Sequence, residues 1–180
     1  APAAGEAILD LSCGPGTHAS RLAHDCEAAL VIGLDRSAPM LHEAVLHLQE
    51  ARAAADLIRG DAANLPFADE TLDAVLNVAS LHLYPDPGAV LRQVARVLRP
   101  GGRFVCSTLL PERLRPLDRL EARAGVHRRS EEALRALCEA AGLEAFERVR
   151  LPPWIFFSTR RAGSPAASLS ATESKRSSSR

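Results

Sequence analysis

The chain has no long apolar run, only one lysine and no paired cysteine motif, and these absences narrow its possible classes. No stretch approaches the roughly 20 consecutive apolar residues that a membrane-spanning helix needs, so we expect no transmembrane segment. Lysine occurs once against 21 arginines, which we interpret as a coding bias rather than a functional signal. No signal peptide is visible in the sequence, which begins with Ala1.

The cysteines do not form a metal-binding pattern. Cys13, Cys26, Cys106 and Cys138 include no C-x-x-C pair, and their spacings match no zinc ligand set. The sequence therefore predicts no metal site. Reduced thiols in a core are the better interpretation, and they are typical of a reducing, intracellular compartment.

Charge and composition divide the chain into a body and a tail. Residues 161–180 hold four basic groups and one acidic group, which leaves 18 basic and 21 acidic groups in residues 1–160. This mildly acidic body argues against a nucleic-acid partner. Residues 162–180 contain seven serines and almost nothing apolar, which predicts a disordered tail. Residues 1–161 are long enough for one domain with a sizeable core.

Strand and helix patterns alternate along this body. Strands are expected at 7–11, 30–34, 56–59, 72–78, 103–107, 146–151 and 154–159, and helices at 19–30, after Ser37, over 90–98 with a stop at 100–102, and after Ser130. Five strands alternating with helices predict an α/β fold with a Rossmann-like, doubly wound parallel sheet. The two late strands, with no helix between them, predict an antiparallel edge, so the sheet has seven strands with an antiparallel last strand.

The segment 8–17 leads from an apolar strand directly into a turn that contains Gly14 and Gly16. Glycines let the backbone approach a ligand closely, and the free N–H groups of a helix start attract negative charge. Asp10 disfavours a pyrophosphate there and favours a ligand with positive charge, such as S-adenosylmethionine (SAM) with its ammonium and sulfonium. Because Gly14-x-Gly16-x-x-Ala19 also fits the dinucleotide fingerprint, an NAD(P)-binding dehydrogenase is an alternative.

Asp35 ends the second strand about 20 residues after the glycines. A carboxylate at this position can accept hydrogen bonds from both hydroxyls of a ribose, in SAM and NAD alike. A helix N-cap is the structural alternative for the same residue.

These residues resemble the class I SAM-dependent methyltransferases, in the ubiquinone/menaquinone-methyltransferase-like (type 11) group. The match is colinear from about Glu6 to Arg161 and rests on ILDLSCGPGTHASRLA, VIGLDRSAPML, GDAANLPFADETLDAVLNVASLHLYPDP and LRQVARVLRPGGRFVCSTLL. Most members have glycine where Ser12 stands. The D-x-S-C-G-x-G variant and the FFSTRR ending are similar to the plant and algal chloroplast branch, which implies a chloroplast location; otherwise the cytoplasm is expected.

The resemblance implies SAM as the cofactor and a set of residues that bind it. In that family pattern Asp61 receives the adenine amino group, the Ala62 N–H lies at the ring, and Met40 packs beside it. The Asn77 and Val78 backbone meets the methionine part. The expected cofactor-binding residues are Asp10, Ser12, Cys13, Gly14, Gly16, Asp35, Arg36, Met40, Asp61, Ala62, Asn77 and Val78.

Two side chains after the fourth strand are candidates for chemistry. His82 is the expected catalytic residue, as a general base where the acceptor needs deprotonation, with a hydrogen-bonded wall residue as the alternative. Tyr84 can face a sulfonium through its ring, or simply belong to the wall. The segment from His127 to Arg129 is expected either to shape the acceptor pocket or to be a solvated face.

The implied function is transfer of a methyl group from SAM to an oxygen or carbon of a small, lipid-like or aromatic acceptor. Only Ala1–Glu6 precede the first strand, so the N-terminal cap helices usual in the family are expected to be missing. A truncated SAM-binding module without turnover is therefore a second alternative beside the dehydrogenase. The oligomeric state is not predicted.

Overall fold

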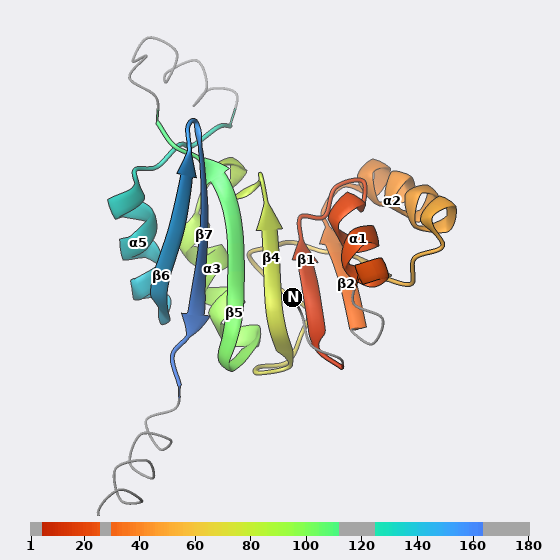
Figure 1. The fold of residues 1–180 in the computed structure, drawn as a ribbon, viewed down its shortest axis with the longest axis horizontal. Helices are drawn as coiled ribbons and strands as arrows, with labels where there is room; N and C mark the ends of the chain where they lie inside the picture. The colour runs from red at the N-terminus through yellow and green to blue at the C-terminus, as the bar shows by residue number, and fades with distance from the viewer. Residues whose placement is uncertain (1–4, 26–29, 112–124, 164–180) are drawn as a thin grey trace, which may run out of the picture.

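The computed structural model describes residues 5–25, 30–111 and 125–163, and they form one seven-stranded sheet. The strand order is β3-β2-β1-β4-β5-β7-β6 (Figure 1). The strands are β1 (Ala7–Leu11), β2 (Leu30–Asp35), β3 (Asp56–Arg59), β4 (Leu72–Val78), β5 (Leu98–Leu109), β6 (Leu143–Leu151) and β7 (Trp154–Arg161). The helices are α1 (Thr17–Asp25), α2 (Ala38–Ala51), α3 (Pro87–Val97) and α5 (Glu131–Ala140), with a 3-10 helix η1 (Leu81–Leu83). The expected Ser-rich tail and Cys26 lie outside the described residues, apart from residues 162 and 163.

The expected doubly wound sheet with one antiparallel strand is confirmed. Strands β1 to β5 pair in parallel, and β7 runs antiparallel to both of its neighbours. The antiparallel strand is not at the edge, however, because β7 lies between β5 and β6. The burial pattern explains this, since β7 buries Ile155, Phe157 and Thr159 in alternation whereas most of β6 is exposed.

Several element boundaries differ from the expected ones. Helix α1 begins at Thr17, two residues early, and the described part ends at Asp25, while Leu30 belongs to β2 rather than to the helix. Residues 100–102 do not stop a helix, because α3 ends at Val97 and these residues lie within β5. The Ser37 and Ser130 N-caps are confirmed by side-chain hydrogen bonds to Met40 N and Ala133 N.

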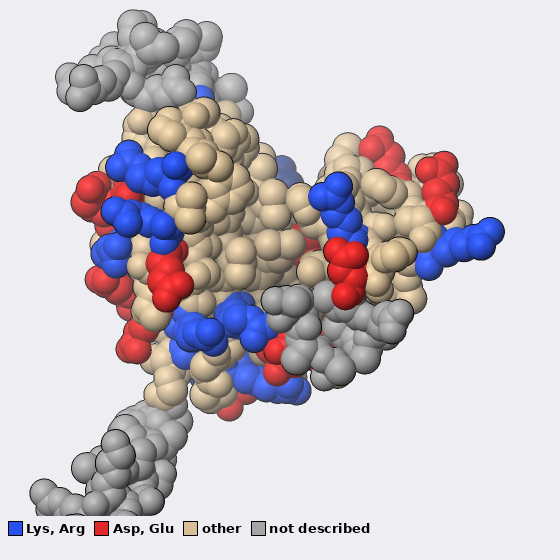
Figure 2. Space-filling view, in the orientation of Figure 1, with Lys and Arg blue, Asp and Glu red and all other residues tan. Residues whose placement is uncertain are grey.

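The core lies between the sheet and the helices that cover it. Leu9, Val75 and Phe104 are completely buried in the middle strands. Helices α3 and α5 lie behind the β5–β7–β6 end, whereas α1 and α2 gather at the β1–β2–β3 end (Figure 1). In this view no described helix stands in front of β4, β5 and β7, and the surface there consists largely of uncharged residues (Figure 2). Val105 of β5 and Phe156 of β7 are 42% and 43% exposed.

The parallel strands bring their carboxyl ends to one edge of the sheet. The glycine turn follows β1 there, Asp35 ends β2, and η1 follows β4. In folds of this kind ligands bind at this edge, where the strand order reverses. Within the described residues, no helix combines the length and the apolar character that crossing a bilayer requires.

Candidate cofactor site

Three residues of the turn between β1 and α1 adopt the left-handed backbone conformation. Ser12, Gly14 and Gly16 all have positive φ angles, of 58°, 54° and 77°. A Cβ atom on Gly16 would lie 2.9 Å from the Cβ of Ala44 in α2, whereas a Cβ on Gly14 would meet nothing within 4 Å. Gly16 is thus required for packing, and Gly14 leaves open space beside the turn in which a ligand can approach the backbone.

Cys13 contributes its backbone carbonyl to this turn, and its thiol donates a weak hydrogen bond to Gly14 O at 3.8 Å. Its side chain is buried against β2, and a Cβ on Gly33 would lie 3.0 Å from its Sγ. Burial, with the nearby negative charges of Asp10 and Asp35, raises the pKa of the Cys13 thiol to about 12. The sulfur is therefore a neutral packing group at ordinary pH.

Asp10 is a buried carboxyl group with an unused acceptor. It is 1% exposed, and its Oδ2 has no hydrogen-bond partner among the described residues. Burial raises its pKa to about 7; the Ala19 backbone N–H opposes this shift, and the negative charge of Asp35 adds to it. A buried polar atom without a partner is costly, so this oxygen fits a cationic or hydrogen-bond-donating ligand.

Asp35 ties the end of β2 to the glycine turn. Its Oδ2 accepts a hydrogen bond from Gly14 N at 2.9 Å, and its Oδ1 accepts one from Ser37 N at 2.8 Å. The N-cap interpretation of Asp35 is wrong, because Ser37 caps α2. Each carboxylate oxygen can accept a further hydrogen bond, so both remain able to receive a ribose hydroxyl.

The other residues expected around the nucleoside lie at the same carboxyl-end edge of the sheet, but they differ in how deeply they are buried. Met40 is partly buried in the first turn of α2, a helix that contacts α1, and the Arg36 side chain is exposed. Asp61 is exposed, and its Oδ1 accepts from Ala63 N at 2.9 Å, the geometry of an ordinary turn aspartate. Ala62 is buried.

A buried polar cluster joins the end of β4 to the glycine turn. Asn77 is fully buried, and its Nδ2 lies 2.9 Å from Leu11 O, 2.6 Å from Ser80 Oγ and 3.0 Å from the Tyr84 hydroxyl. That hydroxyl also lies 2.7 Å from Ser12 Oγ. Sequence reasoning did not predict this cluster, and it missed Ser80; the serine in place of glycine at position 12 was the only signal for it.

His82 lies on η1 in a buried wall of the site. Its Nδ1 is 3.2 Å from Thr108 Oγ1, and its ring meets the ring edge of Trp154 at a centroid distance of 6.2 Å. Its backbone carbonyl accepts from His127 N at 2.6 Å. The segment with Arg129 is therefore half-buried against the site rather than a solvated face.

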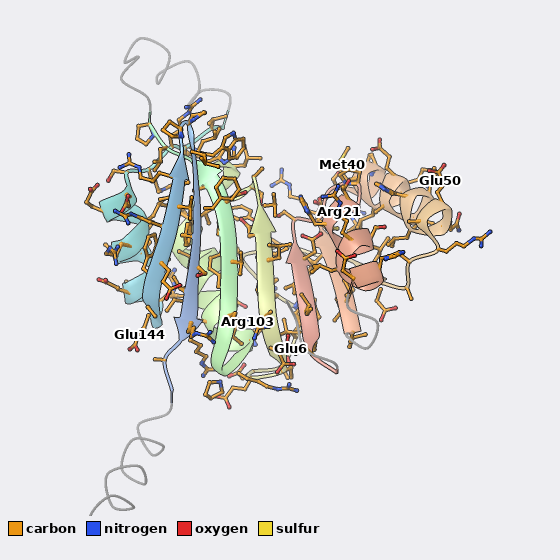
Figure 3. All side chains as sticks on the ribbon, viewed as in Figure 1. Glu6, Arg21, Met40, Glu50, Arg103 and Glu144 are labelled. Carbon is orange, nitrogen blue, oxygen red and sulfur yellow. The ribbon has the colours of Figure 1, made fainter. Side chains whose placement is uncertain are left out.

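The opposite edge of the sheet carries structural contacts. Arg103 and Glu6 form an ion pair of 2.5 Å near the amino ends of the strands, on the other side from Met40 (Figure 3). Within the described ranges, no group of three or more histidine, cysteine, aspartate or glutamate side chains could hold a metal ion.

Several proteins with sequences similar to this chain are named methyltransferases. A family model described as a methyltransferase domain matches residues 9–106. A chloroplastic methyltransferase of Arabidopsis thaliana, named as uncharacterised, is 34% identical over 174 residues, which cover 89% of this chain and 49% of that protein. A fatty-acid O-methyltransferase of Mycolicibacterium smegmatis is 41% identical over 107 residues, which cover 59% of this chain and 38% of that protein.

The fold is also found in a solved methyltransferase structure. Phosphoethanolamine N-methyltransferase 2 of Haemonchus contortus, in complex with SAM, matches with a TM-score of 0.80 at 16% identity, over 90% of this chain and 50% of that one. The chain spans half or less of the length of these relatives. The matched family model covers more than half of the chain, including the glycine turn and β4. The chain therefore belongs to the class I SAM-dependent methyltransferases, with SAM as its cofactor.

Proposed function

We propose that this protein transfers the methyl group of SAM to an oxygen or carbon of a small, lipid-like or aromatic acceptor. The observation that carries the proposal is the buried Asp10 oxygen, which has no hydrogen-bond partner among the described residues and lies beside an open glycine turn. With a pKa of about 7, Asp10 is partly ionised at neutral pH; its ionised form suits the cationic methionine end of SAM and repels a pyrophosphate, which disfavours the dehydrogenase.

The chain's own residues would bind and orient the cofactor. The backbone from Ser12 to Gly16 and that of Asn77 and Val78 would surround its methionine part. Asp35 would accept from the ribose hydroxyls with its remaining lone pairs, and the adenine would lie between Met40 and the Asp61–Ala62 turn. When bound, SAM supplies a methyl group that is already activated, so alignment can provide about 7–11 kcal/mol of the required acceleration.

His82 would act as the general base for an acceptor that must lose a proton. Its Nδ1 lies near the Thr108 hydroxyl. If that hydroxyl accepts from Nδ1–H, the neutral imidazole has its basic nitrogen at Nε2. Imidazole is the side chain most often used as a general base, which suits a hydroxyl or an acidic carbon as the acceptor.

The names of the relatives support the acceptor class and one compartment. One relative is named for a fatty acid and for transfer to oxygen, which supports a lipid-like acceptor. Another is named as chloroplastic and matches along 89% of this chain, which supports a chloroplast location.

Calorimetric titration with SAM, and with NADH as the control, tests the cofactor assignment. We expect SAM to bind and NADH not to bind. Asp35→Ala is expected to weaken SAM binding by tenfold or more, because two ribose hydroxyls lose their acceptor, while the protein stays folded by circular dichroism. Unchanged affinity in a folded Asp35→Ala protein would refute the ribose assignment.

His82→Ala tests the base, with S-adenosylhomocysteine formation measured on a long-chain fatty acid and on a simple phenol. We expect turnover to fall about a hundredfold or more while the SAM affinity stays the same. His42→Ala is the matched control, since His42 is exposed on α2. Equal turnover in the His82 variant would leave it a wall residue, and SAM binding without turnover on any acceptor would support the non-catalytic module.

A further inference from the structure

Two residues with side chains adopt the left-handed backbone conformation on either side of the site. Ser12 follows β1 with a φ of 58°, and Ala79 follows β4 with a φ of 55°. This conformation is disfavoured for every residue except glycine, and it persists only where the surroundings hold it. Ala79 is held by its N–H, which lies 3.0 Å from Ser107 O and 3.1 Å from Ser107 Oγ.

Ser12 is held by a side chain 72 residues away in the sequence. Its Oγ lies 2.7 Å from the hydroxyl of Tyr84, which follows η1 on the β4 side of the site. Tyr84 in turn lies within reach of Asn77 Nδ2. The orientation of the Asn77 amide is fixed, because the Leu11 carbonyl oxygen can only accept and so requires the NH2 group to face it.

This chain of contacts crosses from β4 to the turn that follows β1. The Tyr84 hydroxyl is the part of it that reaches the turn, and burial raises the pKa of this phenol, so it stays protonated at neutral pH. Removing the hydroxyl would leave Ser12 free to relax out of its left-handed conformation. The backbone of the glycine turn would then change conformation, and its amides would no longer lie beside the open space at Gly14.

We propose that Tyr84 is a positioning residue for cofactor binding, and that its hydroxyl holds Ser12, and with it the glycine turn, in the conformation that receives SAM. The proposal rests on the function proposed above. It assigns Tyr84 a role through Ser12, instead of the ring contact with the sulfonium that the sequence suggested.

The test is a double-mutant cycle on the full chain, read by the SAM dissociation constant and by the separate KM and kcat values. Tyr84→Phe is expected to weaken SAM binding roughly tenfold, because the competent turn becomes a minor population. Its kcat at saturating SAM should stay near that of the wild type. In a Ser12→Gly background, Tyr84→Phe should change SAM affinity by less than about twofold, because glycine adopts this φ without help from the tyrosine hydroxyl.

Arg52→Gly is the matched control for glycine replacement. Arg52 is also left-handed, with a φ of 51°, but it caps the far end of α2, so its replacement should leave SAM affinity unchanged. Wild-type affinity in Tyr84→Phe would overturn the proposal. A loss that Ser12→Gly fails to restore would also overturn it, because Tyr84 would then act directly on the cofactor or on the fold.

A second measurement needs no cofactor, so it separates failure of this proposal from failure of the proposed function. Tyr84 is the only tyrosine of the chain, and its ionisation can be followed by ultraviolet absorbance. The Ser12 hydrogen bond lowers the Tyr84 pKa, against the larger effect of burial. Ser12→Ala should therefore raise the Tyr84 pKa further, and an unchanged titration would show that the bond does not form in solution.

Discussion

At the scale of single residues, Asp10 combines burial with an oxygen that has no hydrogen-bond partner in the part of the chain that the structure describes. Burial and the neighbouring Asp35 raise the pKa of its carboxyl group from 3.8 to about 7. The folded chain therefore keeps a proton that the unfolded chain releases at lower pH. Such an arrangement is kept at functional sites, where a ligand compensates for it, and it is rarely useful for stability alone.

Asp10→Asn should remove one pH dependence of stability. Because the folded pKa is the higher one, the stabilising contribution of protonated Asp10 is complete below about pH 4 and is lost as the pH rises to about 7. A shift of about three units corresponds to roughly 4 kcal/mol. Urea unfolding at pH 5, 6, 7 and 8 measures this effect. We expect the free energy of unfolding of the variant to rise relative to that of the wild type from pH 5 to pH 7 and the difference to level off above pH 7. Parallel stability curves would contradict the assigned environment of Asp10.

At the scale of elements, local sequence signals predicted the bounds of several strands but not the contacts between distant parts of the chain. The bounds of β1, β3 and β4 coincide with the expected ones, because an apolar run and its flanking breakers are properties of a short segment. The contact of Ser12 with Tyr84 and the half-buried segment at His127 depend on parts of the chain that only the folded sheet brings together. The position of an ordinary helix stop was also misjudged, because residues 100–102 continue into β5.

The two glycines of the turn should respond differently to the same replacement. Gly16→Ala would combine a left-handed alanine with a contact of 2.9 Å to Ala44, so we expect a loss of about 3–5 kcal/mol. Gly14→Ala has only the backbone cost, about 1–2 kcal/mol, because nothing lies within 4 Å of its Cβ position.

Chemical denaturation of the two alanine variants and the wild type measures this difference. SAM affinity adds a second comparison, since an alanine at position 14 would project into the space left for the ligand. Equal loss of stability in both variants would show that α2 does not pack on the turn as described.

At the scale of the whole molecule, β7 connects the outer strand β6 to the rest of the sheet. Within the described residues β6 pairs with β7 alone, and β7 pairs with both β5 and β6. Phe157 of β7 stacks on Phe146 at 4.8 Å and meets the edge of Phe104 at 5.9 Å. Strand β7 therefore links β6 to β5 through backbone pairing and through the aromatic contacts of Phe157.

A chain that ends at Pro153 should fail to fold. It keeps β6 and α5 but lacks Ile155 and Phe157, which are buried in the core, so β6 has no strand to pair with. We expect no cooperative thermal transition. A chain that ends at Gly163 keeps every described strand and is the matched control, for which a cooperative transition is expected. Cooperative unfolding of the shorter chain would show that the sheet is complete without β7.

The interior place of β7 also has a consequence for biosynthesis. The ribosome makes this strand after all the other described strands, about 50 residues after the end of β5. At about 5–20 residues per second, the outer edge of β5 waits on the order of 3–10 s for its neighbour. An unpaired edge is a template for aggregation, so the nascent domain is most vulnerable in this interval. Slower translation of residues 110–161 would lengthen the exposure, and a chaperone that shields the edge until Arg161 emerges would shorten it.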